Sequence, residues 1–274
     1  MSDSSEKSKV SGIKVTLAVV PALLIVSIIV ALYLGANADK EESQPYEGEV
    51  TVKEMSDYLR NLNEVIGERQ IDTEEGQAAF RQVRAMVMGA LGQQNLGYQV
   101  LQTQLDTANG LLWPTLWVTA GSREEKEVVV VAIPQTGSGT PAALGFALAE
   151  YLAGMTTEAR VRIVFHAPLE EGDFDEWIWK RCGQEGETLK GVIRVLGGDP
   201  KDRVTVLAGP EGENVLQEIR ESKLWSEGLS LDVEAAQGIE VRLIEQGLST
   251  RQEHAGRLIQ LLPLMKTLAD RVAR

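Results

Sequence analysis

Residues 127–171 constrain the fold more than any other stretch, because two strand-like runs flank a helical pattern there. Glu127–Ile133 is a nearly continuous apolar run, typical of a strand buried on both faces of a parallel sheet. Thr140–Leu152 carries leucines at helical spacing, and Arg160–Phe165 is again rich in β-formers. A strand–helix–strand unit of this kind places its functional groups at the carboxyl ends of the parallel strands.

The rest of the chain continues the alternation of helical and strand patterns. Thr51 and Glu54 form a capping box that starts an amphipathic helix, and Thr73 starts a second helix. Pro114 indicates an edge position or a bulge in its strand. Strands are predicted at 97–105, 111–121, 191–198, 203–209 and 239–244, and further helices at 174–181, 212–223 and 250–271. This order predicts an α/β fold with three layers, in which helices flank a mixed, mainly parallel central sheet.

The amino-terminal region contains a second clear signal. Val15–Leu34 is uncharged and apolar, and a helix needs about 20 such residues to cross a bilayer. Lysines precede this run and acidic residues follow it, which predicts a cytoplasmic tail at 1–14 and a single transmembrane helix. A linker at 35–50 then leads to an extracytoplasmic domain at 51–274. The alternative is secretion after cleavage near Ala38, because the preceding residues fit the small-x-small rule.

Composition excludes several functional classes. The formal net charge is −13 and the pI is about 4.8, so nucleic acid is not expected as a partner, because phosphate binding needs a basic face. His166 and His254 are the only histidines, which excludes a multi-histidine metal site. Cys182 is the only cysteine, so no intrachain disulfide is possible, and we expect it to fill space as a small apolar side chain.

Three further features give weaker evidence for a functional site or interface. TGSGT at 136–140 precedes a helix but lacks the lysine that a phosphate-binding P-loop needs, so a plain turn is favoured. Ser138 and His254 could supply a nucleophile and a base, yet no G-x-S-x-G elbow is present, and His254 is expected to be exposed. Trp177 and Trp179 are two residues apart and cannot share a helix face, which predicts one buried and one at a rim or interface.

Two adjacent carboxylates follow the second strand of the unit. Glu170 and Glu171 could act as a general base beside a metal-binding carboxylate. Adjacent acidic residues are also common on solvated loops, and the acidic run continues at Asp173, so without context the solvated loop is favoured. His166 lies one residue past the strand and is expected to be a rim histidine with its hydrogen bonds satisfied.

Several segments, in the correct order, resemble the zinc-dependent aminopeptidase fold shared by bacterial leucyl aminopeptidases, glutaminyl cyclases, nicastrin and the transferrin-receptor ectodomain. The opening helices end in an I-G-x-R turn at 66–69, and a G-Y-x-V strand begins at 97. GSGTPAALGFALAEYL (137–152) resembles the family's S-G-x-A-A-L-L-E-L helix, and VRIVFHAPLEEG (161–172) resembles the strand that ends in two glutamates. The resemblance covers about residues 53–200 and, loosely, the closing helix.

Carried over by position, this resemblance makes Glu170 the general base and Glu171 a metal-binding carboxylate. The remaining ligands are missing, because Ile133-Pro134-Gln135 stands where the family has His-x-Asp, and Leu196 stands where it has the next aspartate. Zinc needs three or four nitrogen, oxygen or sulfur donors in close array, and isoleucine, proline and leucine offer none. The resemblance therefore implies a degenerate member in which Glu170 and Glu171 are vestigial. The candidates for its relic cleft are Ile133, Gln135, His166 and Leu196.

The leading hypothesis is a membrane-anchored, extracytoplasmic aminopeptidase-like domain that is catalytically inactive. It would need no zinc cofactor and would bind or scaffold a peptide or protein partner. One alternative is an active metallo-aminopeptidase that uses Glu170 with zinc in a rearranged site. A second alternative is an anchored assembly domain that interacts through exposed tryptophans.

Overall fold

The computed structural model describes residues 49–106, 110–122, 124–169, 172–197, 204–209, 213–221, 229–233, 239–243 and 250–274. All of these fall within the unit Glu47–Arg274. The predicted transmembrane segment Val15–Leu34 and most of the predicted linker lie outside the described residues. Within the described ranges, no helix combines the length and the apolar character needed to cross a membrane.

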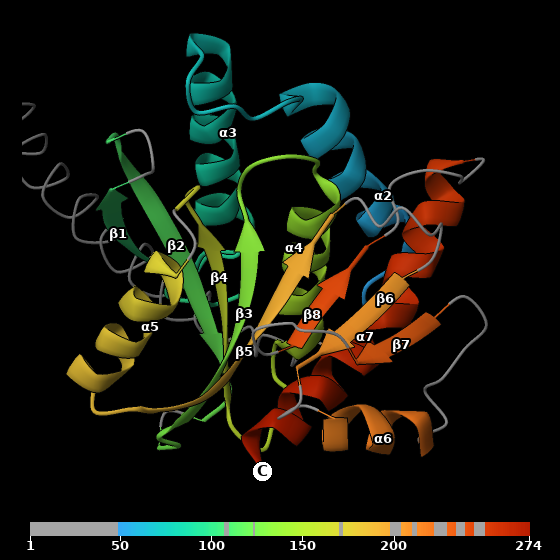
Figure 1. Cartoon of the computed structure of the whole chain (residues 1–274). Helices are drawn as coiled ribbons and strands as arrows, with labels where there is room; N and C mark the ends of the chain where they lie inside the picture. Colours follow the sequence, from blue (N-terminus) through green and yellow to red (C-terminus); the bar gives the residue numbers. More distant parts are fainter. Residues whose placement is uncertain are drawn as a thin grey trace, which may run out of the picture. The chain divides into compact units, whose positions relative to one another are not determined.

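An eight-stranded sheet forms the centre of the described fold, with the strand order β1-β2-β4-β3-β5-β8-β6-β7 (Figure 1). The four central strands β4, β3, β5 and β8 are mutually parallel, whereas β2 is antiparallel to β4 and β6 is antiparallel to β8. The strands are β1 Leu101–Asp106, β2 Leu112–Ala120, β3 Glu127–Pro134, β4 Arg160–His166, β5 Thr188–Leu196, β6 Val204–Ala208, β7 Leu229–Val233 and β8 Ile239–Arg242. The predicted α/β class with a mixed, mainly parallel sheet is confirmed.

Two details of the sheet differ from expectation. Pro114 does not mark an edge strand, because β2 lies between β1 and β4. The register between β2 and β4 begins only at Leu116, so the missing N–H of Pro114 costs no ladder bond on the β4 side. β7 was not predicted, because Leu229–Val233 is too short to give a distinct periodic signal.

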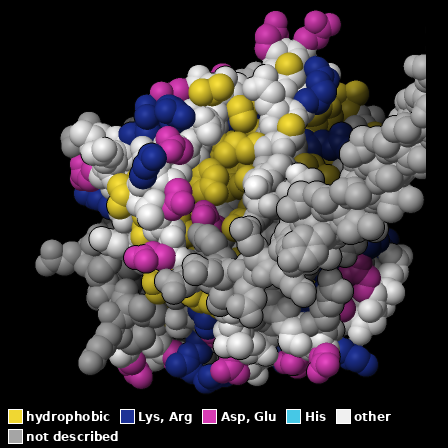
Figure 2. Space-filling model, turned by 180° about the vertical axis from the view of Figure 1, so that it is seen from behind, with side chains coloured by type: hydrophobic (Ala, Val, Ile, Leu, Met, Phe, Trp, Pro, Cys, Tyr) yellow, Lys and Arg dark blue, Asp and Glu magenta, His cyan; other side chains and the backbone are white. Residues whose placement is uncertain are grey.

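Helices cover the two faces of the sheet unequally. α2, η1, α3, α4, α6 and α7 contribute to one large core with the strands, whereas α5 packs against the opposite face. The helices are α2 Val52–Arg60, the π-helical segment η1 Asn61–Ile66, α3 Glu74–Ala90, α4 Thr140–Leu152, α5 Asp173–Gln184, α6 Glu213–Glu221 and α7 Arg251–Ala273. Viewed from behind, hydrophobic side chains remain at the surface among acidic and basic ones (Figure 2).

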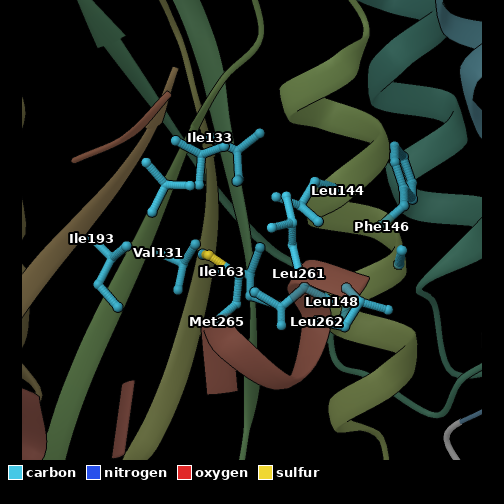
Figure 3. Packing of buried hydrophobic residues seen from close by; sticks show 14 of the residues in the cluster. Val131, Ile133, Leu144, Phe146, Leu148, Ile163, Ile193, Leu261, Leu262 and Met265 are labelled. Carbon is cyan, nitrogen blue, oxygen red and sulfur yellow. The ribbon is translucent and has the colours of Figure 1, made fainter. Parts of the chain in front are cut away.

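The large core joins the central strands to α4 and α7 (Figure 3). Alternate residues of β3 and β4, such as Val131 and Ile163, point toward leucines of both helices, and Met265 of α7 lies among them. Gly145 brings α4 close to the sheet, because a Cβ atom there would lie 3.0 Å from Ile133 Cγ1 and 3.0 Å from Phe165 Cε1. This close approach fixes the strand ends that precede the predicted site.

The α5 face has a smaller, aromatic core. Trp117 of β2 is buried, and Trp177 of α5 meets it edge to face with ring centroids 5.8 Å apart. The guanidinium of Arg181 lies 5.1 Å above the Trp117 ring, a cation–π contact. Trp179 is 64% exposed. The two tryptophans thus differ in exposure as predicted, but Trp177 is half-buried and not fully buried.

Candidate functional site

The carboxyl ends of β3, β4, β5 and β8 meet at one edge of the sheet, because these strands are parallel. This edge brings Gln135, His166 and Leu196 into the same region, as the strand–helix–strand pattern predicted. The beginning of β2 also reaches this edge, since β2 runs antiparallel to β4. These side chains differ, however, in how deeply they are buried and in which hydrogen bonds they make.

Gln135 is fully buried and its amide is committed to main-chain carbonyls. Its Nε2 donates to the carbonyl of Phe165 over 2.7 Å and to that of Pro114 over 2.9 Å, while its backbone N–H donates to the carbonyl of His166 over 3.0 Å. Thr115 adds a similar tie, because its Oγ1 accepts the backbone N–H of Ala167 over 3.1 Å. Gln135 Oε1 accepts no hydrogen bond from the described residues. The side chain thus joins the ends of β2, β3 and β4.

Arg69 contacts the main chain at the same edge of the sheet. Its side chain is buried, and its guanidinium donates to four carbonyls, those of Leu62, Gly67, Gln135 and Gly137, over 2.7 to 3.1 Å. Such charge-assisted bonds are stronger than neutral ones, and each satisfies a main-chain oxygen that would otherwise be poorly paired. Arg69 therefore pins the loop after β3 to the segment that follows α2.

The TGSGT loop is held by further local bonds. The N–H of Gly139 donates to Asn63 Oδ1 over 2.6 Å, and the N–H of Thr140 donates to Ser138 Oγ over 3.3 Å. Gly137 has φ 74°, a backbone conformation that glycine adopts without strain. Two N–H groups that a phosphate would need are thus already used, which supports the plain turn.

Two of the expected cleft residues are apolar and lie differently. Ile133 has no exposed surface and packs in the main core under Gly145, so it is not accessible to a ligand. Leu196 is half-buried at the end of β5, and its carbonyl accepts the N–H of Leu243 over 2.8 Å. Of these two, only Leu196 retains surface at the carboxyl edge.

His166 is the last residue of β4, and its side chain is titratable. Its Nδ1 donates to the carbonyl of Ala167 over 2.8 Å, so the ring is the Nδ1–H tautomer, and its centroid lies 4.8 Å from that of Phe174. Burial lowers the pKa of His166 to about 4, the bond to Ala167 opposes this shift, and the positive charge of Arg194 adds to the lowering. The ring is therefore neutral at physiological pH, and Nε2 has no hydrogen-bond partner among the described residues.

The loop between β4 and α5 carries the predicted carboxylates. Glu170 and Glu171 lie outside the described residues. On α5, Asp175 pairs with Arg194 of β5 over 2.5 Å, with both groups partly exposed. In the described ranges, no group of three or more histidine, cysteine, aspartate or glutamate side chains is placed to hold a metal ion.

The donor set at this edge does not fit the zinc site of the resemblance. A Gln135 amide whose N–H groups already serve two carbonyls stands where the family has a charged ligand. Leu196 offers no donor, and His254 lies half-buried in the first turn of α7, whereas we expected it to be exposed. Among the described residues at this edge, His166 alone presents an imidazole nitrogen.

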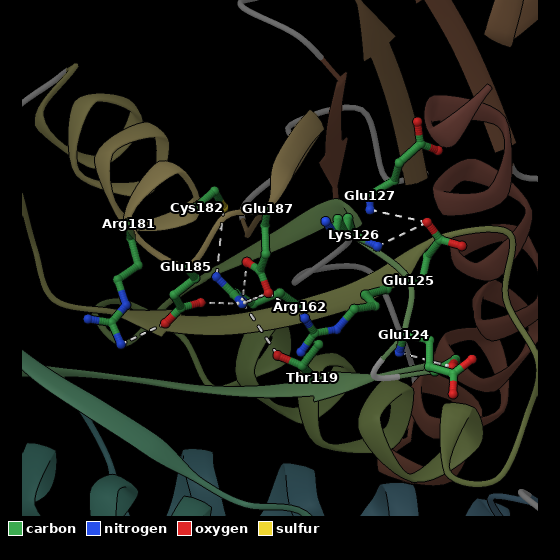
Figure 4. A network of polar contacts seen from close by, with 12 residues as sticks. Thr119, Glu124, Glu125, Lys126, Glu127, Arg162, Arg181, Cys182, Glu185 and Glu187 are labelled. Atoms are coloured by element: carbon green, nitrogen blue, oxygen red, sulfur yellow. Dashed lines mark hydrogen bonds and ion pairs between the residues drawn. The ribbon is translucent and has the colours of Figure 1, made fainter.

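A second polar cluster lies away from this edge, on the α5 face (Figure 4). The buried Arg162 of β4 pairs with Glu185 and with Glu187 over 2.8 Å each, and its Nη1 lies 3.7 Å from the buried Cys182 thiol. Arg160 shares Glu187, and burial raises the pKa of Cys182. These contacts pair the charges within the fold, and the thiol is buried, which agrees with a cysteine that fills space as a small side chain.

Sequence reasoning missed Arg69 and Arg162. Arg69 belongs to the I-G-x-R turn that helped to establish the resemblance, so a signal was present but carried no role. Arg162 alternates with apolar residues in β4, and nothing in that pattern distinguishes a buried arginine from an exposed one.

Solved structures with the same architecture identify the fold. A glutaminyl cyclase from an Acidobacteriales bacterium matches with a TM-score of 0.56 and 13% identity over 85% of this chain and 97% of that chain. A leucine aminopeptidase precursor from Bacteroides thetaiotaomicron matches with a TM-score of 0.52 and 12% identity over 77% and 95%, respectively. The fold is that of zinc-dependent exopeptidases and glutaminyl cyclases. No protein-family model and no curated sequence matches the chain.

A third structure agrees with this aminopeptidase-like fold. The glutaminyl cyclase of Porphyromonas gingivalis matches with a TM-score of 0.52 and 13% identity, over 81% of this chain and 98% of that chain. The aminopeptidase-like domain thus spans nearly the full length of these proteins.

Proposed function

We propose that this protein is a membrane-anchored, extracytoplasmic, aminopeptidase-like domain that binds a peptide or protein partner without hydrolysing it. The arrangement of Gln135 carries the proposal. Its amide N–H groups serve the carbonyls of Phe165 and Pro114, and Arg69 holds the loop that follows. A catalytic zinc needs three or four donors and an open position, and this corner is occupied by main-chain hydrogen bonds.

The surroundings favour the amino-terminal end of a peptide as the ligand. His166 is neutral and its Nε2 is an acceptor, while Asp175 places on the adjacent α5 a partly exposed carboxylate that an amine would share with Arg194. An acceptor and a carboxylate suit a protonated amine, and the chain as a whole is acidic, with net charge −13. The hydrolytic machinery is not needed for such binding.

Fluorescence anisotropy with a labelled peptide tests the binding proposal. We expect the full chain to bind a peptide with a free amino terminus and to bind its acetylated form at least tenfold more weakly. Asp175→Asn should weaken binding, whereas Asp57→Asn, which alters a carboxylate on α2, should not. Equal binding of the free and acetylated peptides contradicts recognition of the amine.

Anchoring follows from the amino-terminal sequence and is proposed with it. Val15–Leu34 would cross the membrane, with residues 1–14 in the cytoplasm and the domain outside. Membrane fractions extracted with alkaline carbonate should retain the chain, and amino-terminal sequencing should find residues before Ala38. Soluble protein that begins at Asp39 would instead support secretion after cleavage.

An active metallo-aminopeptidase is the second candidate, and His166 favours it. A neutral imidazole at the end of β4, four residues before Glu170 in the sequence, could contribute to a rearranged zinc site. This candidate predicts release of amino-terminal residues, or cyclisation of amino-terminal glutamine, that disappears in Glu170→Gln and persists in Glu176→Gln. The proposal made here predicts no turnover that depends on Glu170.

An anchored assembly domain is the third candidate, favoured by Trp179 because this large apolar side chain is 64% exposed. Light scattering of the full chain with Trp179→Ser would then report a smaller assembly, whereas the binding proposal expects no change.

A further inference from the structure

β1 forms one edge of the sheet and pairs only with β2 among the described residues (Figure 1). The register with β2 is regular from Leu101 to Asp106, so the outer side of β1 presents a regular row of main-chain groups that pair with no other described strand. Just before the strand, Tyr98 Oη donates to the carbonyl of Ala149 over 2.7 Å. This bond ties the chain before β1 to α4 and holds the edge in place.

The sequence of this edge reads the same in both directions. Leu101-Gln102-Thr103-Gln104-Leu105 is symmetric about Thr103. In an antiparallel pair of two copies related by a two-fold axis, each residue meets its counterpart in the reversed order. The palindrome therefore places leucine opposite leucine, glutamine opposite glutamine, and Thr103 opposite itself.

Nothing in residues 101–105 protects this edge from such pairing. Natural edge strands are usually blocked by lysine, proline, a bulge or an inward-pointing charge, and this segment has none of them. The side chains of Leu101, Thr103 and Leu105 are half-buried, whereas those of Gln102 and Gln104 are exposed. One face of the strand is thus partly apolar and the other is uncharged and able to form hydrogen bonds.

We propose that β1 is a homodimer interface, in which the β1 strands of two copies pair antiparallel about a two-fold axis at Thr103. The two sheets join into one continuous sheet across the axis. The half-buried Leu101 of one copy packs against Leu105 of the other. This inference concerns a different part of the fold from the carboxyl edge and does not depend on the ligand bound there.

The surroundings of β1 are compatible with this register. Asp106 falls opposite Val100 of the other copy, so no carboxylate meets a carboxylate across the axis. Arg84 of α3 donates to Gln102 Oε1 over 2.9 Å, and a cavity of about 200 Å³ lined by Arg84, Gln102, Thr103, Gln104 and Pro114 adjoins the strand. Gln104 of the second copy would extend beside Gln102 and could enter this space.

Cysteine cross-linking of the full chain in mild detergent tests the register. Residues opposite each other in an antiparallel pair have Cα atoms about 4.5–5.5 Å apart, within the range of about 4.4–6.8 Å that a disulfide spans. Thr103→Cys should therefore form a disulfide-linked dimer under mild oxidation by copper phenanthroline. Gln102→Cys alone should not, because residue 102 lies two positions, about 7 Å along the strand, from its own counterpart.

A mixture of Gln102→Cys and Gln104→Cys chains gives the decisive comparison. Residue 102 faces residue 104 of the other copy, so the mixture should link as heterodimers while each variant alone stays monomeric on a non-reducing gel. Wild-type chain is the background control, because Cys182 is buried. Linking by Gln102→Cys alone to the same extent as Thr103→Cys, or no linking by Thr103→Cys, overturns the proposal.

Sedimentation of uncross-linked chains adds a second measurement. Thr103→Lys places two positive charges on the axis. It should raise the dissociation constant of the dimer of the full chain at least tenfold, so that the monomer becomes the main species. The matched change Ser122→Lys, beyond the end of β2, should leave the dimer intact. Equal melting temperatures of the two variants confirm folding. A dimer that survives Thr103→Lys in a folded protein contradicts the interface.

Discussion

Arg69 Nε donates to the main-chain carbonyl of Gln135 over 2.7 Å, although the two residues are 66 positions apart in the chain. This bond connects the segment after α2 to the loop after β3, at the corner where the resemblance places the first metal ligands. Together with the amide of Gln135, it makes the corner part of the folded scaffold.

Replacing Arg69 should destabilise the fold strongly. Arg69→Ala leaves the carbonyls of Gln135 and Gly137 without their buried donor, and each buried unsatisfied group costs about 1–3 kcal/mol. We expect a loss of at least about 3 kcal/mol in urea unfolding. Arg60→Ala, which removes an exposed arginine of α2, should change stability by less than about 0.5 kcal/mol. A small loss in Arg69→Ala would mean that the loop is held by other contacts.

Changing the amide of Gln135 should reveal its role as a donor. Gln135→Glu puts an acceptor carboxylate against the carbonyls of Phe165 and Pro114, so we expect a loss of about 3 kcal/mol or more at pH 7. Gln135→Met keeps the length without the charge and should cost less. The deficit of Gln135→Glu should shrink as the pH falls, because a protonated carboxyl can donate. A pH-independent deficit would argue against this explanation.

The ring of His166 should resist protonation. Burial lowers its pKa from 6.5 to about 4, so the folded chain binds this proton more weakly than the unfolded chain. The associated stability is fully present above about pH 6.5 and is lost as the pH falls toward 4. His166→Gln should therefore reduce the slope of stability against pH in this window. An NMR titration midpoint of the His166 ring above pH 6 in the folded chain contradicts the assignment.

The sequence predicts those parts of the fold and of the candidate site that depend on neighbouring residues, and not those that depend on contacts between distant segments. The apolar runs at 127–133 and 160–165 predicted β3 and β4 because burial on both faces leaves a local pattern. The resemblance to the aminopeptidase fold predicted that Ile133-Pro134-Gln135 stands where that family has His-x-Asp. It could not predict that Gln135 would bond to Pro114 and Phe165, because those partners meet only in the tertiary fold. For the same reason, the sequence did not reveal that Ile133, which we expected to line a cleft, is buried under Gly145.

The close approach of α4 to the sheet gives a matched pair of glycine variants. A Cβ at Gly145 would meet Ile133 and Phe165 at 3.0 Å, so Gly145→Ala should cost about 1–3 kcal/mol of overpacking. Gly256 lies inside α7 with nothing within 4 Å of such a Cβ, so Gly256→Ala should gain about 0.5–1 kcal/mol from helix propensity. Thermal unfolding of both variants checks the opposite signs. Equal effects would contradict the packing described for Gly145.

The Arg162 cluster should matter through burial of its carboxylates. Arg162→Met removes one of the two arginines that pair with Glu187, whose side chain is only 6% exposed. Breaking a buried pair costs about 3–5 kcal/mol, and we expect the lower end of this range because Arg160 still pairs with Glu187. The Cys182 thiol should then react more slowly with a thiol reagent in the native state, because the lost guanidinium lowers the pKa of this thiol while Glu185 and Glu187 raise it. Lys180→Gln, in an exposed pair of α5, should change neither quantity. Unchanged thiol reactivity in Arg162→Met would mean that the guanidinium does not lower the pKa of this thiol.

We propose that the carboxyl edge of this fold binds its partner without a catalytic zinc, because Gln135 and Arg69 fill the corner where the resemblance places the first metal ligands. Metal analysis of the full chain, loaded with zinc and then dialysed against a weak chelator, tests it most directly. We expect far less than one zinc per chain and no change in Glu171→Ala. One zinc per chain that is retained by the wild type and lost in Glu171→Ala would contradict it.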